Sequence, residues 1–454
     1  MQAEHAAMAM PAFLGGLSPV VVSSSIIGLA YVFIISEKIN RAVVALLGAA
    51  LMIFLGVLNQ KLAIQGVDFN TIALLIGMMV IVGITKETGV FQYVAIMSAK
   101  AVKANPRALL AVLSLVTAIF SAFLDNVTTV MLIVPITLLL TEQLKLNPFP
   151  FLIAQIFFSN AGGAATLIGD PPNILIGSAL GFSFMDFVYN VGEACVVTLI
   201  FLLIFFDFVW GRKMTTSDHA KAHLLSYNAK EAIKNKKLLV KSLVTLALVI
   251  GGFIFGHDQG LEPGSIALSG AAFLILLDVI GKDAEDQTHA VHKAFSNVEW
   301  ETIFFFIGLF ILVYGVEHAG VLKLLGEELL SLTGGNMIKT GYVVLWSSAI
   351  LSAIVDNIPF VATMIPLLQS TADQLGGPEA IKPLWWALSL GACLGGNGSL
   401  IGASANVMVA SFAGRAGHRI SFMRFFVIGF PLMLATMVIC HIFVGLKFFG
   451  GQFF

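Results

Sequence analysis

The sequence predicts an all-α polytopic membrane protein. We expect two inverted-topology repeats, about 10 transmembrane helices, two re-entrant hairpins and broken helices at a central site. Its 454 residues are 58% hydrophobic and 11% charged, whereas soluble domains have about 25% charged residues. The mean hydropathy is +0.94. In addition, two polar, helix-breaking motifs each occur twice inside apolar surroundings.

Uninterrupted apolar stretches account for most of the predicted spans. Each approaches the roughly 20 residues that a helix needs to cross a bilayer. Continuous apolarity excludes a transmembrane β-barrel, because its strands alternate polar and apolar residues. The stretches lie near 20–36, 40–58, 70–86, 190–210, 238–256, 264–280, 301–317 and 424–447.

The first repeated motif interrupts two further apolar stretches. The sequence DNVTT at 125–129 lies inside 106–141, and DNIPF at 356–360 lies inside 339–372. Each stretch consists of two apolar halves that we expect to be too short to cross the membrane alone. The Asp-Asn pairs are therefore predicted at the tips of two re-entrant hairpins.

The second repeated motif predicts two broken helices. GGAATLIGDPPN at 162–173 lies inside 150–180, and GGNGSLIGASAN at 395–406 lies inside 384–413. Pro171 and Pro172 cannot both sit within a regular helix, because each lacks a backbone donor. We expect 162–173 to be unwound, with its glycines letting the backbone approach a ligand closely. Such backbone is tolerated at membrane depth only inside protein or along a wet cavity.

The motif pairs are separated by 231 (356 − 125) and 233 (406 − 173) positions, which divides the chain into repeats. The predicted first repeat is 1–210 and the second is 238–454, joined by a basic linker at 211–237. Each half contains an odd number of crossings, so the second half enters the membrane upside down. Inverted repeats with discontinuous helices are characteristic of secondary transporters.

The distribution of Lys and Arg predicts the orientation. With the N-terminus outside, most of these residues fall on the cytoplasmic side, as the positive-inside rule requires. The chain is expected in the cell inner (plasma) membrane, with the 211–241 linker in the cytoplasm. Residues 1–19 contain no Lys or Arg, so they lack the basic region of a cleaved signal peptide.

Several function classes are disfavoured. The three cysteines form no CxxC pair, so neither a disulfide framework nor a cysteine metal site is indicated. A P-loop is absent from the sequence, which argues against an ATP-driven pump. The Gly-x-Gly-Asp motif of intramembrane aspartyl proteases is also missing. We expect no enzyme activity, cofactor, metal or nucleic-acid partner.

Polar residues of the four motifs are the candidate site. Carboxylates at membrane depth mark ion or proton pathways, so proton coupling is assigned to Asp125, Asp356 and Asp170. The alternatives are that the hairpin aspartates only cap helices and that Asp170 only shapes a turn. Because the four motifs contain no Lys or Arg, a strongly anionic dicarboxylate is disfavoured as substrate. The candidate substrate- or ion-binding residues are Asp125, Asn126, Thr128, Thr129, Asn160, Thr166, Asn173, Asp356, Asn357, Asn397, Ser399, Ser404 and Asn406.

At these motifs the chain resembles the arsenite permease, NhaD and P-protein (pink-eyed dilution) group of the ion transporter superfamily. The resemblance covers nearly all the chain after the first span. It implies a scaffold domain and a mobile transport domain, moving as an elevator, with hairpin tips and unwound helices meeting at a central site. Asp-Asn stands at both tips here, whereas the best-known enterobacterial arsenite permeases have Asn-Asp and Asn-Asn.

The leading hypothesis is proton-coupled efflux of arsenite or antimonite across the inner membrane. Arsenite is mainly an uncharged trihydroxide at neutral pH, which suits a site of amides, hydroxyls and backbone dipoles. A sodium/proton antiporter and a transporter of a small organic or inorganic anion are the alternatives, with Na⁺ in place of H⁺ as coupling ion in the former. A soluble ATPase partner on the linker and a homodimer both stay open.

Overall fold

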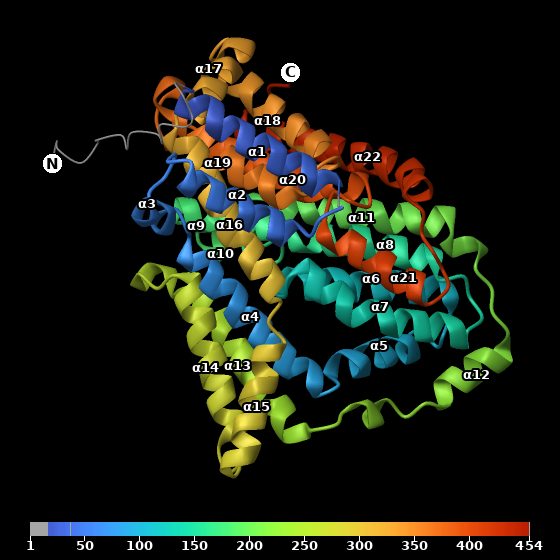
Figure 1. Ribbon diagram of the computed structural model, residues 1–454. Coiled ribbons are helices and arrows are strands. Elements are labelled where there is room, and N and C mark those ends of the chain that lie inside the picture. The colour runs from blue at the N-terminus through green and yellow to red at the C-terminus, as the bar shows by residue number, and fades with distance from the viewer. Residues whose placement is uncertain (1–16, 37, 454) are drawn as a thin grey trace.

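The computed structural model describes residues 17–36 and 38–453, and within these it contains 22 α-helices and no strand (Figure 1). The predicted all-α membrane fold is thereby confirmed, while the expectations for residues 1–16 lie outside the described residues. Eight helices are long and apolar enough to cross a membrane. They are α1 (Pro19–Ser36), α4 (Phe69–Glu87), α6 (Pro106–Phe123), α7 (Asn126–Gln143), α11 (Gly192–Val209), α13 (Lys236–Phe255), α16 (Trp300–His318) and α22 (Phe422–Phe448).

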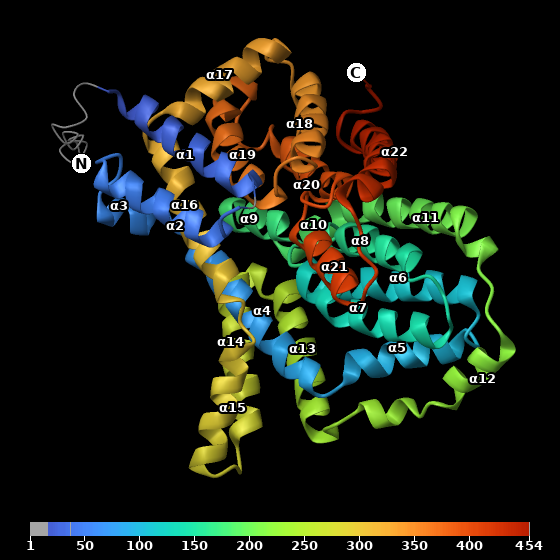
Figure 2. The same cartoon turned by 45° about the vertical axis from the view of Figure 1, so that its right-hand side comes forward.

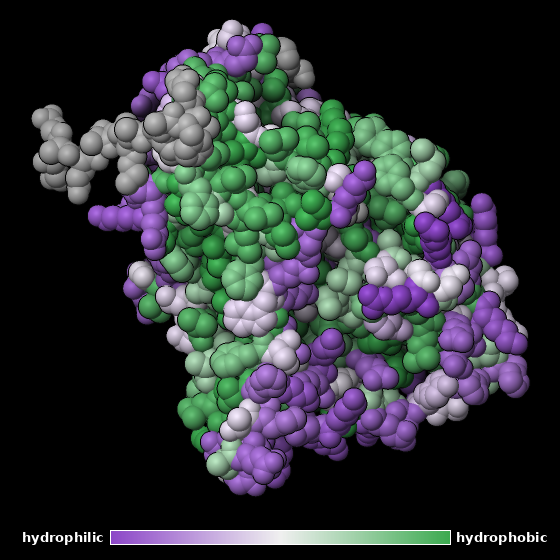
Figure 3. Space-filling view, in the orientation of Figure 1, coloured by the Kyte–Doolittle hydropathy of each residue, from purple (hydrophilic) through white to green (hydrophobic). Residues whose placement is uncertain are grey.

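The span predicted at 40–58 is shorter than expected and forms α2 (Arg41–Phe54), with 14 residues, whereas the span predicted at 264–280 forms α14 (Pro263–Val279), with 17 residues. Together with α4 and α16 they make a packed group, with α2 against α16 and α14 against α4. Large apolar side chains on the outer helices face outward; Leu248 of α13, for example, is 60% exposed. Figure 3 shows hydrophobic residues covering the face over α1 and α2, while hydrophilic residues gather near α15 (Ala284–Ser296) and the α12 segment.

Each Asp-Asn pair lies where two antiparallel helices meet. The first hairpin is α6 and α7, and the second is α18 (Met337–Ser352) and α19 (Asn357–Thr371). Asp125 and Asp356 are the N-caps of α7 and α19, and each carboxylate accepts a backbone N–H of the helix that follows. The expectation that every half is too short to cross was wrong for the first hairpin, since α6 and α7 have 18 residues each.

Both predicted broken helices are present. The first consists of α8 (Phe149–Gly163) and α9 (Pro171–Leu180), and the second of α20 (Lys382–Gly395) and α21 (Ser404–Arg415). The first break is shorter than predicted, because Gly162 and Gly163 still belong to α8 and Pro171 already begins α9. Prolines are tolerated in the first turn of a helix, where the N–H has no intrahelical partner.

The 231-residue offset recurs in the helix boundaries. α4 and α16 begin at 69 and 300, α6 and α18 at 106 and 337, and α7 and α19 at 126 and 357. Gly89 and Gly320, before α5 (Val90–Ala101) and α17 (Val321–Thr333), have φ angles of +83° and +85°. Residues that carry a side chain rarely adopt this left-handed backbone conformation, whereas glycine does so readily. The division into repeats at 1–210 and 238–454 stays a prediction.

The linker runs as a strap along the open end of the first hairpin. It contains α12 (Asp218–Ser226) and leads from α11 to α13 past α5 and α7 (Figure 2). The Thr216 hydroxyl donates to the Leu144 carbonyl at 2.6 Å, and the Lys234 N–H donates to the Thr88 carbonyl at 3.0 Å. The remaining α-helices, α3 (Gln60–Gln65) and α10 (Phe184–Asn190), are short connecting elements.

Candidate functional site

A cluster of buried amides joins the two halves of the chain. Asn126 at the first hairpin tip donates from Nδ2 to Oδ1 of Asn160 in α8, at 3.0 Å. Asn160 in turn donates from Nδ2 to Oδ1 of Asn397 and of Asn406, both at 3.0 Å. All four side chains are at most 2% exposed. The structure therefore brings together four of the predicted site residues, from both broken helices and one hairpin.

The two unwound segments are held by matching asparagines. Asn173 donates from Nδ2 to the carbonyls of Ala164 and Thr166, at 3.0 and 2.9 Å. Asn406 donates from Nδ2 to the carbonyls of Gly396 and Ser399, at 2.7 and 2.9 Å. Both asparagines bond the carbonyls that their broken helix leaves free. These two asparagines thus stabilise the irregular backbone, and the carbonyls that they bond are not free to bind a ligand through the same hydrogen bonds.

Asp170 lies beside the residues that contact the first hairpin tip and is the buried carboxylate of the first helix break. It is fully buried, and the N–H of Asn126 donates to the neighbouring Gly169 carbonyl at 3.0 Å. Its Oδ1 accepts one long bond of 3.5 Å from Asn357 Nδ2, at the second hairpin tip. Its Oδ2 has no partner among the described residues, and its side chain does not cap α9. The Asp170 side chain therefore makes no hydrogen bond to the turn within the described residues, although its backbone carbonyl accepts the Asn173 N–H at 3.0 Å.

Other buried polar atoms near the cluster also lack partners within the described chain. They are Oδ1 of Asn126, Oγ1 of Thr129 and Nδ2 of Asn397. Each buried unpaired polar group costs about 1–3 kcal/mol, and a native structure has only a few of them. Four of the nine such side-chain atoms in the described residues, these three and Asp170 Oδ2, belong to the first hairpin and the two helix breaks, which suits a small ligand or ion that offers both donors and acceptors.

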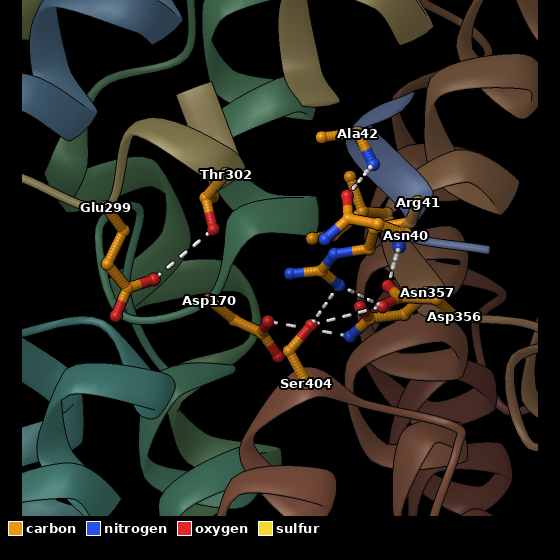
Figure 4. A network of polar contacts seen from close by, with 10 residues as sticks. Asn40, Arg41, Ala42, Asp170, Glu299, Thr302, Asp356, Asn357 and Ser404 are labelled. Atoms are coloured by element: carbon orange, nitrogen blue, oxygen red, sulfur yellow. Dashed lines mark hydrogen bonds and ion pairs between the residues drawn. The ribbon is translucent and has the colours of Figure 1, made fainter. Parts of the chain in front are cut away.

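The two hairpin aspartates have different surroundings. Asp125 accepts the Thr128 N–H at 2.8 Å and also the Thr128 hydroxyl, so its hydrogen bonds are those of a helix cap. Asp356 forms an ion pair with Arg41, whose Nη1 lies 2.8 Å from Oδ2. The hydroxyl of Ser404 donates to the same oxygen at 3.1 Å. Figure 4 shows Arg41, Asp356 and Ser404 converging beside the Asp170–Asn357 contact.

Arg41 corrects the inference that no cation lies near the motifs. It is the first residue of α2, and its partner Asp356 is 315 positions away in the sequence. From the sequence, Arg41 is only one of the basic residues expected on the cytoplasmic side, beside the start of a predicted span. The absence of Lys and Arg from the four motifs therefore does not by itself disfavour an anionic substrate.

A cavity of about 540 Å³ extends between the two hairpin tips. Burial raises the pKa of Glu299, just before α16, and the nearby Asp125 carboxylate raises it further. The cavity is lined by residues from the end of α1, the start of α2 and α21, and it includes Asp356 and Ser404. Its charged lining residues are Arg41, Glu299, Glu301, Asp356 and Arg415.

Three predicted residues have local structural roles. Thr128 bonds Asp125, the Thr166 hydroxyl donates to the Ala122 carbonyl at 2.6 Å, and the Ser399 hydroxyl accepts the Ile401 N–H at 3.2 Å. Two residues outside the predicted set contact Asn173 Oδ1 instead. They are Ser389, whose hydroxyl lies at 2.6 Å, and Cys393, whose Sγ lies at 3.5 Å.

The amide cluster predicts a large effect for Asn160→Ala. The change would leave Asn126, Asn397 and Asn406 each without one partner inside the protein. We expect the free energy of unfolding to fall by at least about 2 kcal/mol. Thermal unfolding of the purified protein in detergent measures this. Asn70→Ala is the control, since the Asn70 side chain also makes two contacts between helices, donating to Ser178 and accepting the Gly264 N–H, but in half-buried surroundings. An equal loss in both variants would contradict the special role of the cluster.

Comparison with known proteins identifies the family. The sequence pattern of CitMHS, described as a citrate transporter family, matches residues 31–391 of this chain. The chain belongs to the CitMHS family. An uncharacterised transporter of Mycobacterium tuberculosis (strain H37Rv) is 40% identical over 433 residues, covering 94% of this chain and 99% of the relative. This CitMHS chain is thus a membrane transporter.

A second group of relatives agrees with the resemblance seen at the motifs. The P protein of Homo sapiens is 33% identical to this CitMHS chain over 516 residues, which cover 94% of the chain and 60% of the P protein. The crystal structure of the Alcanivorax borkumensis YdaH transporter has the same fold, with a TM-score of 0.58 at 12% identity, covering 96% and 99% of the two chains. The predicted membership in the ion transporter superfamily is confirmed.

Proposed function

We propose that this chain is a secondary active transporter that exports a small uncharged polyhydroxyl solute, arsenite or antimonite trihydroxide, in exchange for protons. One observation carries the proposal. Buried amides from both broken helices and the first hairpin meet beside a buried carboxylate, Asp170, that has a free oxygen. A trihydroxide offers hydroxyl donors and oxygen acceptors to such a set. The CitMHS family supports transport as the activity.

The charges of the cavity support a neutral solute over an anion. Arg41 is already paired with Asp356, so its charge is not free. Arg415 shares the lining with the two glutamates Glu299 and Glu301. Like charges opposed at close range cost several kcal/mol. A dicarboxylate in this cavity would therefore meet a net negative surface.

Proton coupling is best assigned to Asp170. Asp356 is neutralised by Arg41, and within the described part of the chain the Asp125 side chain accepts bonds from its own helix alone. Asp170 has neither an ion pair nor a cap, and it touches the second hairpin through Asn357. Binding or release of one proton at Asp170 would change the charge on the first broken helix and the strength of its contact with Asn357 of the second hairpin. Asp125 and Asp356 keep structural and charge-setting roles in this mechanism.

Movement of the central elements relative to the outer group would alternate access. The hairpins and broken helices carry the site, and α1, α2, α4, α14 and α16 surround it. Side-chain contacts join the two groups: Tyr31 of α1 donates to the Pro359 carbonyl at 2.8 Å, Asn70 of α4 donates to Ser178 at 2.8 Å, and Arg41 of α2 bonds Asp356 and Ser404. We place the chain in the inner membrane, with the 211–241 strap and the mouth of the cavity on the cytoplasmic side, so that this structure is inward-open.

Sodium/proton exchange is the second candidate, and a specific observation favours it. Two of the unpartnered buried atoms, Asp170 Oδ2 and Asn126 Oδ1, are acceptors only. Oxygen acceptors without a protein donor suit a hard cation. Under this alternative, Asp170 Oδ2 and Asn126 Oδ1 would bind Na⁺ instead of accepting hydrogen bonds from the hydroxyls of arsenite.

A binding titration of the purified protein tests the choice. We expect arsenite and antimonite to raise the unfolding temperature saturably, because their hydroxyls satisfy buried groups. Citrate should have no such effect. Stabilisation by sodium alone would favour the exchanger, and stabilisation by citrate alone would overturn the neutral-solute proposal. Asn160→Ala should lose the arsenite response, while Asp218→Asn in the exposed strap should keep it.

A further inference from the structure

The ion pair between Arg41 and Asp356 connects two parts of the fold that meet at the cavity. Arg41 begins α2 in the outer group, and Asp356 caps α19 at the second hairpin tip. The Arg41 Nη1 lies 2.8 Å from Asp356 Oδ2 and 2.6 Å from Ser404 Oγ at the start of α21. The guanidinium also lies over the Phe305 ring, 5.0 Å from its centroid. Four elements therefore fix this one cation.

The two hairpin tips differ in this respect. Asp125 is bonded by Thr128 and has no ion pair within the described residues, whereas Asp356 has one. The Arg41 and Asp356 side chains are 25% and 12% exposed, so the pair faces the cavity rather than open solvent. The Arg41–Asp356 pair therefore acts on a solute in the cavity through its charges at short range.

The pair determines the charge that the cavity presents. With Arg41 and Asp356 joined, the other charged lining residues are Arg415, Glu299 and Glu301. A solute then meets one unpaired positive group against two negative groups. If Asp356 lost its charge, the guanidinium of Arg41 would face the cavity beside the Ser404 hydroxyl. A guanidinium with a neighbouring hydroxyl is a good binding site for a carboxylate.

We propose that the Arg41–Asp356 pair is the charge filter of the transporter. Asp356 occupies the guanidinium of Arg41, so an anion finds the cation at the second hairpin tip already paired, whereas an uncharged solute passes. This inference rests on the proposed function, because it explains how a neutral solute is selected. It assigns Asp356 to solute selectivity, and it makes Arg41 a specificity-determining residue.

The test is a titration with citrate in buffer without divalent cations, followed by isothermal calorimetry. Asp356→Asn keeps a side chain that can cap α19 but removes the charge. We expect wild type to show no citrate binding and Asp356→Asn to gain it, with an affinity about tenfold or more above the wild-type limit, the scale of one charge-assisted hydrogen bond. The double variant Arg41→Gln/Asp356→Asn should lose the gain. Arg415→Gln, which removes the other cavity arginine, should behave as wild type.

A complementary variant tests the same pair without relying on Asp356→Asn to fold. Arg41→Ala leaves the Asp356 carboxylate facing a space the size of a guanidinium. Free guanidinium ion at millimolar concentration should raise the unfolding temperature of Arg41→Ala saturably, and it should not do so for wild type or for Arg41→Ala/Asp356→Asn. Absence of this rescue together with absence of citrate binding by Asp356→Asn would overturn the proposal. Citrate binding by wild type that Arg41→Gln abolishes would also overturn it.

These outcomes are separable from failure of the proposed function. Neither titration contains arsenite, so the charge filter can be refuted while arsenite transport stands. Conversely, wild type that ignores arsenite but follows the citrate and guanidinium pattern would refute arsenite as substrate and leave the filter intact.

Discussion

The Asp170→Asn protein is expected to fold and insert normally but to lose coupled transport by at least about a hundredfold. The amide has the shape of the carboxylate and can keep the contact with Asn357, but it cannot take up and release a proton. Asp170 is fully buried, has no ion pair among the described residues, and its Oδ2 has no hydrogen-bond partner there. Loss of a positioned proton carrier costs about 10²–10⁴ in rate. Uptake of arsenite into proteoliposomes under an imposed pH gradient measures the effect.

Asp218→Asn is the control for this measurement. Asp218 lies on the exposed strap, and Lys221 holds the pKa of that carboxyl below its usual range. Its replacement should leave transport unchanged. Proton-coupled transport by Asp170→Asn at the wild-type rate would remove Asp170 from the mechanism and return the role to Asp125 or Asp356.

Gly169→Ala is expected to prevent accumulation of folded protein. A Cβ at this position would lie 2.4 Å from the Ser121 carbonyl and 2.6 Å from Gly163 Cα. Both contacts are with backbone, which cannot move aside without displacing the first hairpin or α8. We expect a loss of at least about 3 kcal/mol in the free energy of unfolding. Gel filtration of a fluorescent fusion, read as the fraction of monodisperse protein, reports this.

The matched control is Gly414→Ala in α21. A Cβ there meets nothing within 4 Å, and alanine favours the helix over glycine by about 1 kcal/mol. Folded protein should reach at least the wild-type level. If Gly169→Ala were equally well tolerated, close packing of the unwound segment against the hairpin would not be required.

The sequence predicted the positions of the main elements because its signals were local. Apolar length located the spans, and the Asp-Asn and Gly-rich motifs located the hairpin tips and helix breaks. The same local signals misjudged the function of the glycines. They were expected to admit a ligand, but in the structure Gly162 and Gly169 admit the backbone of the first hairpin at Ala118 and Ser121. Which neighbour a glycine faces depends on tertiary packing, which a single sequence does not reveal.

The candidate site was predicted in part for the same reason. The asparagines of the cluster were named from the sequence, since polar residues at membrane depth are conspicuous. Arg41 was missed because arginine near a span end is ordinary in a membrane protein, and only folding brings it to Asp356. The asymmetry between the two hairpin tips likewise arises from α2, an element outside every repeated motif.

The most direct test of proton-coupled export of a neutral metalloid is proton flux in proteoliposomes that contain only the wild-type protein. An inward or outward arsenite gradient should drive protons in the opposite direction, in the absence of sodium and citrate. Proton movement driven by a sodium gradient, with no dependence on arsenite, would contradict this mechanism.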